Sequence, residues 1–217
     1  MTEQMALELS FRPAFGRSNF WVAPCNQEAI AWVDKYPDWP MHALLIYGEA
    51  GSGKTHLAAI FSEERIEAAD LAEDYIPVQE KIVVENVDRS CNEKALFHLF
   101  NRVHEMGGGL LMTAQKVPEF QLPDLRTRIG MIPKSEIQIP DEQTIMSVCA
   151  KMFSDKQVRV EPAVLAYIAT HVMRSFEAVR KVVNLADELS LAHGRPITIY
   201  VVKEAIEKIS KTGGFNA

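Results

Sequence analysis

Apolar residues in the first two thirds of the chain form short runs that alternate with segments of helical spacing. Four of these runs predict buried strands: ALLIY at 43–47, IVV at 82–84, the run that begins in GGGLLM at 107–112, and IQI at 137–139. Three segments predict helices: residues 26–36, a segment from Lys54, and residues 93–106. Strands that alternate with helices indicate a parallel sheet covered on both faces. We therefore expect an extended arm over residues 1–20 and an α/β domain over residues 21–139.

The pattern changes after Pro140, where only helical periodicity remains. In the segment that Asp141 can cap, apolar residues recur at i, i+3, i+4, i+7 and i+8, which is one face of a helix. Three further helices are expected to begin near these residues: Pro162, Ser175 and Thr198. Because no strand pattern of comparable strength follows, residues 140–217 predict a small all-helical domain.

Composition narrows the classes of protein. With 47% hydrophobic residues, the chain has enough apolar material for a buried core. No apolar run approaches the roughly 20 residues that span a bilayer. The N-terminus carries acids where a signal peptide has basic residues, and the three cysteines are isolated, so we expect a cytoplasmic protein. A net charge of −6 argues against a protein whose main function is to bind bare DNA.

The segment GEAGSGKT at residues 48–55 matches the phosphate-binding pattern G-x-x-x-x-G-K-[ST], directly after an expected strand and at the start of a helix. Its glycines let backbone N–H groups approach phosphates, and the helix N-terminus adds positive potential. We expect Lys54 to reach the β- and γ-phosphates and Thr55 to bind Mg²⁺. The alternative is a chance glycine-rich turn, and for His56 a packing role. The candidate nucleotide-binding residues here are Gly48, Gly51, Ser52, Gly53, Lys54, Thr55 and His56.

A P-loop protein also needs an acid at the end of a neighbouring strand to hold the metal. KIVVENVD at 81–88 places Glu85 at that position, as the second candidate Mg²⁺ residue. The next residue is Asn86, which can hydrogen-bond a water but cannot take its proton, so we expect weak or no intrinsic hydrolysis. Asp88 is the nearest substitute but is expected to point elsewhere. Both acids could instead be ordinary surface residues at a strand end.

Two further segments, ALFHLFNRVHEMGGGLLMTAQKVPEF and LPDLRTRIG, are more specific than the P-loop. Together with the arm and the helical C-terminal part, they resemble the ATPase domain of the bacterial replication initiator DnaA. The chain is most similar to the truncated Hda family, the DnaA-related AAA+ regulatory inactivators. The resemblance covers nearly the whole chain and implies an AAA+ fold, a helical lid, and ADP or ATP with Mg²⁺ as ligands; which nucleotide is the working one stays open.

The resemblance also assigns roles to single residues. Thr113 aligns with the sensor-1 segment, although Gln115 stands where the initiator has an acid. Arg128 aligns with an arginine finger, which would act in trans on the ATP of a neighbouring molecule and is worth about 10³–10⁵ in rate. Arg126 is the alternative finger, and either arginine could simply pair with a surface acid such as Asp124.

In the helical part, MRSFEAVRK aligns with sensor 2, but Glu177 falls where the family has an arginine. Arg174 and Arg180 lie three residues to either side on nearly the same helical face. Arg180 is the candidate for nucleotide contact, and a solvated lid arginine is the alternative. Phe20, Trp21 and Val22 fall where the family packs the adenine, and core anchoring of the arm is the other interpretation.

The arm carries QMALEL, which is similar to the QLxLPL peptide by which such proteins dock on the β sliding clamp. An extended segment could place Leu7 and Leu9 in an apolar pocket while Gln4 bonds at its edge. Met5 for Leu and Glu8 for Pro are the departures. The alternatives are a disordered tail or an N-terminal strand.

These residues lead to an expected function. The chain would be a regulator of replication initiation that binds adenine nucleotide and the DNA-loaded clamp and promotes hydrolysis of DnaA-bound ATP through Arg128. DNA would be reached only through the clamp, and no membrane is involved. A self-standing AAA+ ATPase that loads a helicase or another replication protein is the alternative, and a small P-loop kinase is a third. Whether the chain forms a homo-oligomer stays open.

Overall fold

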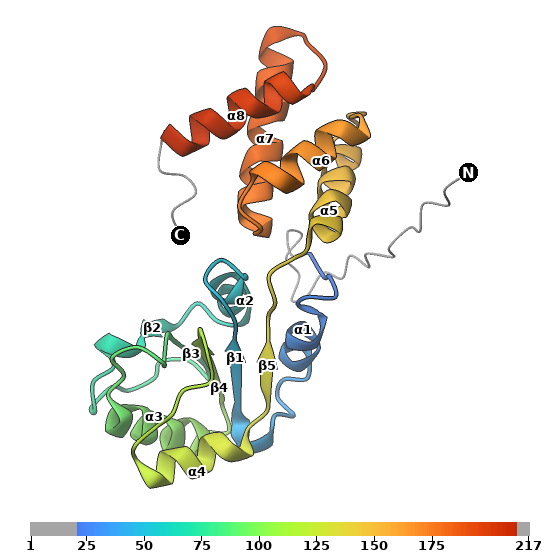
Figure 1. The fold of residues 1–217 in the computed structure, drawn as a ribbon. Coiled ribbons are helices and arrows are strands. Elements are labelled where there is room, and N and C mark those ends of the chain that lie inside the picture. Colours follow the sequence, from blue (N-terminus) through green and yellow to red (C-terminus); the bar gives the residue numbers. More distant parts are fainter. Residues whose placement is uncertain (1–20, 212–217) are drawn as a thin grey trace. The chain divides into compact units, whose positions relative to one another are not determined.

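The computed structural model of the protein describes residues 21–211, which divide into two compact units, residues 21–138 and residues 139–211 (Figure 1). The first unit is built on a parallel sheet of five strands in the order β2-β3-β4-β1-β5. The strands are β1 Ala43–Tyr47, β2 Arg65–Glu67, β3 Lys81–Glu85, β4 Gly109–Ala114 and β5 Lys134–Glu136. All six residues of β4, at the centre, are buried. This arrangement confirms the predicted α/β class.

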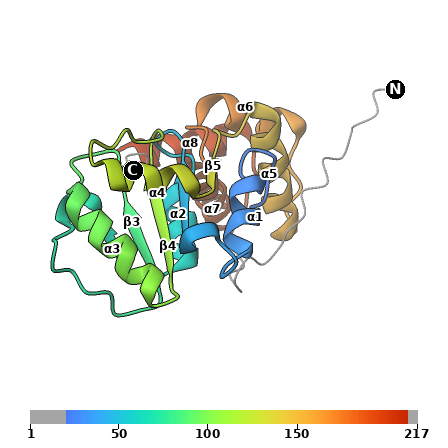
Figure 2. The ribbon, with the colours of Figure 1, turned by 90° about the horizontal axis from the view of Figure 1, so that it is seen from below.

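Helices cover both faces of this sheet (Figure 2). They are α1 Gln27–Asp34, α2 Lys54–Phe61, α3 Glu93–Glu105 and α4 Pro123–Met131, with the short 3₁₀ helices η2 Pro40–His42 and η3 Ala68–Asp70. Side chains alternate along a strand, so Leu45 of β1 joins the core with α3 and α4, whereas Leu44 and Ile46 join the core with α1 and α2. The central strands are apolar on both faces for this reason.

The structure corrects the strand expected at residues 137–139. The edge strand β5, the fifth in chain order, lies just before this segment, at Lys134–Glu136. Ile137 is buried in the core, and its N–H donates to the carbonyl oxygen of Tyr47 at 2.8 Å, immediately after the strand ends. The apolar pattern therefore identified a buried segment and not the hydrogen-bonded strand. The strand itself is polar, and only its Ser135 is buried. β2, at the other edge, is also polar and was not predicted.

The second unit consists of helices in its described residues: α5 Glu142–Asp155, α6 Pro162–His171, α7 Phe176–His193 and α8 Ile199–Lys211. Two of the predicted caps are present: the side chain of Asp141 accepts from Thr144 N at 2.7 Å, and that of Ser175 accepts from Ala178 N at 3.1 Å. α5 packs on α6 and α7, and α7 packs on α8. Within residues 21–211, no helix combines the length and the apolar character needed to cross a bilayer.

Candidate functional site

The P-loop connects the end of β1 to the start of α2. Its three glycines have positive φ values, +153° at Gly48, +78° at Gly51 and +106° at Gly53, which favour glycine. A Cβ atom on Gly48 would lie 2.2 Å from the carbonyl oxygen of Ile137, so no larger residue fits there without a shift of the backbone. Local backbone geometry thus explains why the loop needs glycine. Because glycine has no side chain, the backbone N–H groups of these three residues are not covered by side chains of their own.

Lys54, the first residue of α2, is 8% exposed. Its Nζ donates to the carbonyl oxygens of Gly48 at 2.7 Å and Glu49 at 2.8 Å, so the ammonium group is folded over the loop. Burial lowers the pKa of Lys54, the negative charge of Asp88 acts in the opposite direction, and the positive charge of Arg89 lowers that pKa further. A desolvated cation at the mouth of a P-loop is suited to phosphate oxygens.

Thr55 and Glu85 lie together, as the sequence predicted for a metal site. The hydroxyl of Thr55 donates to Glu85 Oε2 at 2.9 Å, and Arg65 Nη1 lies 3.2 Å from the other carboxylate oxygen, Oε1. A hydroxyl and a carboxylate are hard oxygen ligands, and Mg²⁺ in phosphate sites takes one or two such groups together with phosphate oxygens and waters. The residues present therefore fit Mg²⁺ in company with a nucleotide, while residues 21–211 contain no cluster of three or more His, Cys, Asp or Glu that could hold a metal.

Asn86 and Thr113 meet where β3 and β4 end. The N–H of Asn86 donates to Thr113 Oγ1 at 3.2 Å, and its side-chain Nδ2 donates to Glu67 Oε2 at 2.9 Å. Thr113 is buried, and its carbonyl oxygen accepts from the N–H of Val87 at 2.9 Å. The amide group of Asn86 is thus engaged with the end of β2.

The sequence spacing predicts that Asp88 points away from the site, but the structure places it near the P-loop. Its Oδ2 accepts from the backbone N–H of Gln115, just beyond β4, at 3.0 Å, and its charge acts on Lys54. Sequence spacing along β3 could not reveal this contact, because it depends on β3 and β4 being neighbours in the sheet. The structure therefore places Asp88 beside the end of β4, a position that the sequence spacing did not predict.

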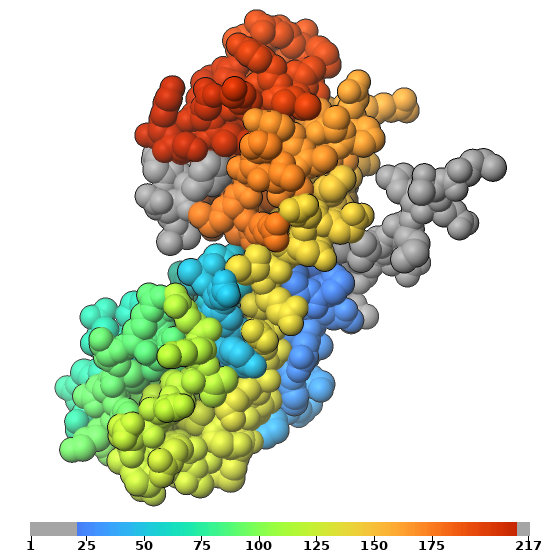
Figure 3. Space-filling view, viewed as in Figure 1, coloured from blue at the N-terminus to red at the C-terminus, as the bar shows by residue number. Residues whose placement is uncertain are grey.

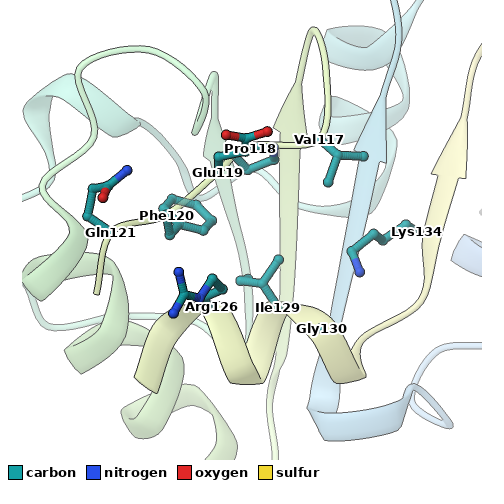
Figure 4. Close-up of a pocket in the computed structure, with 9 residues that line it drawn as sticks. All are labelled: Val117, Pro118, Glu119, Phe120, Gln121, Arg126, Ile129, Gly130 and Lys134. Atoms are coloured by element: carbon teal, nitrogen blue, oxygen red, sulfur yellow. The ribbon is translucent and has the colours of Figure 1, made fainter. Parts of the chain in front are cut away.

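The two arginines of α4 have different surroundings. The guanidinium carbon of Arg128 lies 5.3 Å from the ring centroid of Phe97 and 5.5 Å from that of Phe100, both on α3. Arg126 is exposed and lines a cavity of about 370 Å³ beside α4, opposite Lys134 (Figure 4). Two residues correspond to about 200° around a helix, so the two side chains leave α4 on opposite sides. α4 itself lies at the surface of its unit (Figure 3).

In the helical unit, the two sensor-2 candidates, Arg174 and Arg180, have different contacts. Arg174 Nη2 donates to Glu142 Oε1 at 2.7 Å, and Lys181 pairs with Glu177 at 2.8 Å. Arg180 is partly exposed and forms no ion pair with any residue between 21 and 211. The structure leaves Arg180 as the more available of the two arginines.

Of the candidate adenine-binding residues, Val22 packs against the core formed with α1 and α2. The carbonyl oxygen of Trp21 accepts from Asn26 Nδ2 at 2.7 Å. These contacts agree with core anchoring and do not test adenine binding. Phe20 and the candidate clamp-binding residues lie outside the described residues: Gln4, Met5, Leu7 and Leu9.

The parallel sheet, the P-loop between β1 and α2, and the following helices define the AAA+ class of P-loop folds. Domain III of the DnaA replication initiation protein of Thermotoga maritima has this fold, with a TM-score of 0.66 and 20% identity over 92% of this chain and 98% of that one. A structure of DnaA bound to AMPPCP and single-stranded DNA matches with a TM-score of 0.65 and 17% identity, covering 83% of this chain and 66% of that one.

The sequence comparison identifies the same relatives. The chain is 24% identical over 234 residues to the chromosomal replication initiator protein DnaA of Magnetococcus marinus, covering 91% of this chain and 52% of that protein. The chain spans about half the length of the curated relatives it matches. No family model matches the chain. The similarity is therefore to the AAA+ part of DnaA.

Proposed function

We propose that this protein regulates the initiation of chromosome replication in the manner of the Hda family. It binds adenine nucleotide and the DNA-loaded sliding clamp, and it promotes hydrolysis of ATP on the initiator DnaA, so that initiation is not repeated. The observation that carries the proposal is a P-loop with Lys54 and the Thr55–Glu85 pair in place, within a DnaA-like fold.

The geometry of the loop supports the proposed nucleotide binding. Lys54 and the N-terminus of α2 provide positive potential for the phosphates, and Thr55 with Glu85 would hold Mg²⁺. A bound Mg²⁺ would neutralise phosphate charge. The DnaA structure with AMPPCP supports an adenine nucleotide, ADP or ATP, as the ligand. Trp21 and Val22 at the adenine and Arg180 at the phosphates are further proposed contacts.

The chain's own hydrolysis is proposed to be weak. Asn86 offers no carboxylate to polarise a water, and its amide group already donates to Glu67. Thr113 uses its hydroxyl to hold the backbone of Asn86, and Gln115 carries no charge. Nucleotide binding would then serve mainly to stabilise the folded protein.

The proposed action in trans depends on Arg128. The planar guanidinium is held above two rings of α3, and it would stabilise transition-state charge on the ATP of an adjacent initiator. The arm residues Gln4, Leu7 and Leu9 would tether the protein to the clamp and so raise its effective concentration near the initiator.

The decisive experiment measures hydrolysis of DnaA-bound ATP in the presence of clamp loaded on DNA. Arg128→Ala should abolish the stimulation, because an arginine finger contributes about 10³–10⁵ in rate. Arg126→Ala is the matched control: it removes the same charge from the same helix, on the opposite side, and should leave the stimulation intact. Full stimulation by Arg128→Ala would refute the finger assignment, and loss only in Arg126→Ala would transfer the role to Arg126.

Clamp binding is tested separately by a pull-down with purified clamp. Gln4→Ala/Leu7→Ala should lose binding, whereas Thr2→Ala/Glu3→Ala, changed at neighbouring positions outside the motif, should retain it. If the wild type does not bind, the tether is wrong. Sustained ATP turnover by the protein alone would instead favour a self-standing ATPase that loads a replication protein.

A further inference from the structure

Two apolar side chains project from the connection between β2 and β3. Ile76 is 69% exposed and Val78 is 89% exposed, the highest values among the large hydrophobic residues between 21 and 138. Pro77, which lies between them, is buried. Single exposed apolar residues are ordinary on a protein surface, but these two are close neighbours that flank one buried residue. The pair therefore presents apolar surface that a partner could cover.

The backbone that carries this pair is fixed to the edge of the sheet. Residues 68–80 connect the edge strand β2 to β3 and lie at the margin of the first unit (Figure 2). The carboxylate of Glu64 accepts from the hydroxyl of Tyr75 at 2.7 Å, from the N–H of Val78 at 2.8 Å and from the N–H of Gln79. Arg102 Nη1, on α3, donates to the carbonyl oxygen of Tyr75 at 2.8 Å. Because the backbone is already ordered and β-branched side chains have few rotamers, contacts made here cost little conformational entropy.

The net negative charge of the chain is concentrated around the same pair. Of the 29 acidic residues and the 23 Lys and Arg residues, residues 63–80 contain seven and one, so that 22 of each remain elsewhere. The net charge of −6 therefore belongs to this segment, and the rest of the chain is neutral. Six of the acids are exposed: Glu63, Glu67, Asp70, Glu73, Asp74 and Glu80. None of the six forms an ion pair with a residue in the described range 21–211, so this charge is available to a partner.

We propose that residues 63–80 form a docking surface for a basic segment of another protein. Apolar side chains of the partner would cover Ile76 and Val78, while flanking Lys or Arg residues would face the exposed acids. An apolar centre with a polar rim is the usual anatomy of a protein–protein contact. Charge complementarity selects this partner, because the acids attract a cationic chain and repel nucleic acid and other polyanions. The proposal does not depend on the function proposed above, since none of these residues belongs to the P-loop or to α4.

The test measures binding of the full chain to two labelled synthetic peptides by fluorescence anisotropy. One peptide contains leucines flanked by lysines, and the other has serine in place of every leucine, so both carry the same charge. The wild type should bind the lysine–leucine peptide about tenfold more tightly, because only this peptide can cover apolar surface on Ile76 and Val78. Higher salt should weaken both complexes, since salt screens exposed charges.

One pair of variants isolates the apolar contribution. Ile76→Ser/Val78→Ser should remove the preference for leucine and leave binding of the lysine–serine peptide unchanged. Leu191→Ser/Tyr200→Ser removes two exposed apolar side chains from the helical unit and should keep the preference. A preference that persists in Ile76→Ser/Val78→Ser would overturn the proposed docking surface.

A second pair of variants isolates the charged contribution. Glu73→Gln/Asp74→Asn should weaken binding of both peptides severalfold, because exposed charge pairs each contribute a modest amount. Glu188→Gln/Glu207→Gln makes the same change of charge at exposed positions of the helical unit and should bind both peptides as the wild type does. Equal weakening by the two variants would show that the peptides respond only to net charge, and would overturn the proposal.

Nuclear magnetic resonance of the wild type provides a readout that needs no variant. Titration with the lysine–leucine peptide should shift the backbone amide signals of residues 63–80 most strongly. Equal affinity for the two peptides, or shifts centred outside this segment, would overturn the docking surface. A wild-type dimer in sedimentation that Ile76→Ser/Val78→Ser dissociates would also overturn it, because a second copy of the chain would then cover the apolar pair.

Discussion

The ion pair between Arg65 and Glu85 should weaken Mg²⁺ binding at the proposed site. Arg65 Nη1 lies 3.2 Å from Glu85 Oε1, and the side chains are 38% and 8% exposed. A metal that draws on the Glu85 carboxylate must compete with this cation. Because Arg65 is substantially exposed, solvent screening limits the pair to about 1 kcal/mol. That free energy corresponds to about a fivefold change in a binding constant.

Arg65→Gln should therefore lower, by about fivefold, the Mg²⁺ concentration at which ATP binding is half-maximally enhanced. The assay is titration of a fluorescent ATP analogue at a series of Mg²⁺ concentrations. Lys94→Gln removes the same charge from an exposed position on α3 and serves as the control. If the Mg²⁺ dependence of Arg65→Gln is unchanged or shifts to higher concentrations, Arg65 does not compete with the metal and the assignment of Glu85 as a metal residue loses its support.

Three further changes have defined expectations. Gly48→Ala should abolish nucleotide binding in calorimetry and lower the melting temperature, because the added Cβ would lie 2.2 Å from a backbone oxygen. The pKa of Tyr75 is raised from 10.0 to about 12, chiefly by burial and then by its hydrogen bond to Glu64. The resulting stabilisation, about 1–2 kcal/mol after discounting for screening, is present below pH 10 and lost as the pH rises towards 12. Urea unfolding should show this loss in the wild type and not in Tyr75→Phe. Phe97→Leu should reduce Arg128-dependent hydrolysis severalfold, because cation–π contacts of about 1 kcal/mol hold the guanidinium in place, whereas Phe97→Tyr should restore it.

The central strands were predictable from sequence because both of their faces are buried. β1, β3 and β4 are nearly continuous apolar runs, and the helices of the second unit show a regular apolar face. The edge strands β2 and β5 carry charged residues at their exposed positions, so their sequences resemble loops. The short apolar segment near Ile137 was mistaken for a strand because burial and pairing produce the same apolar signal.

The local part of the candidate site was predictable in the same way. Lys54 and Thr55 are identified by a motif whose spacing fixes the backbone, and Glu85 by its place at a strand end. The contacts of Asp88 with Gln115 and of Arg65 with Glu85 join segments 27 and 20 residues apart. Such contacts depend on the strand order β2-β3-β4-β1, which no local pattern in a single sequence encodes.

The two proposed activities draw on separate parts of the same unit. The P-loop site lies at the carboxyl ends of β1, β3 and β4, whereas Arg128 leaves α4 towards the rings of α3. Neither a hydrogen bond nor a ring contact joins Arg128 to Lys54 in the part of the chain that the structure describes. Removal of the Lys54 ammonium should therefore leave the platform of Arg128 in place. A Lys54 variant that lost both nucleotide binding and the action in trans would give a different result. The bound nucleotide would then have to stabilise a conformation of the protein that favours the complex with the initiator. A ligand can shift such a conformational equilibrium only by the difference in its affinity for the two states.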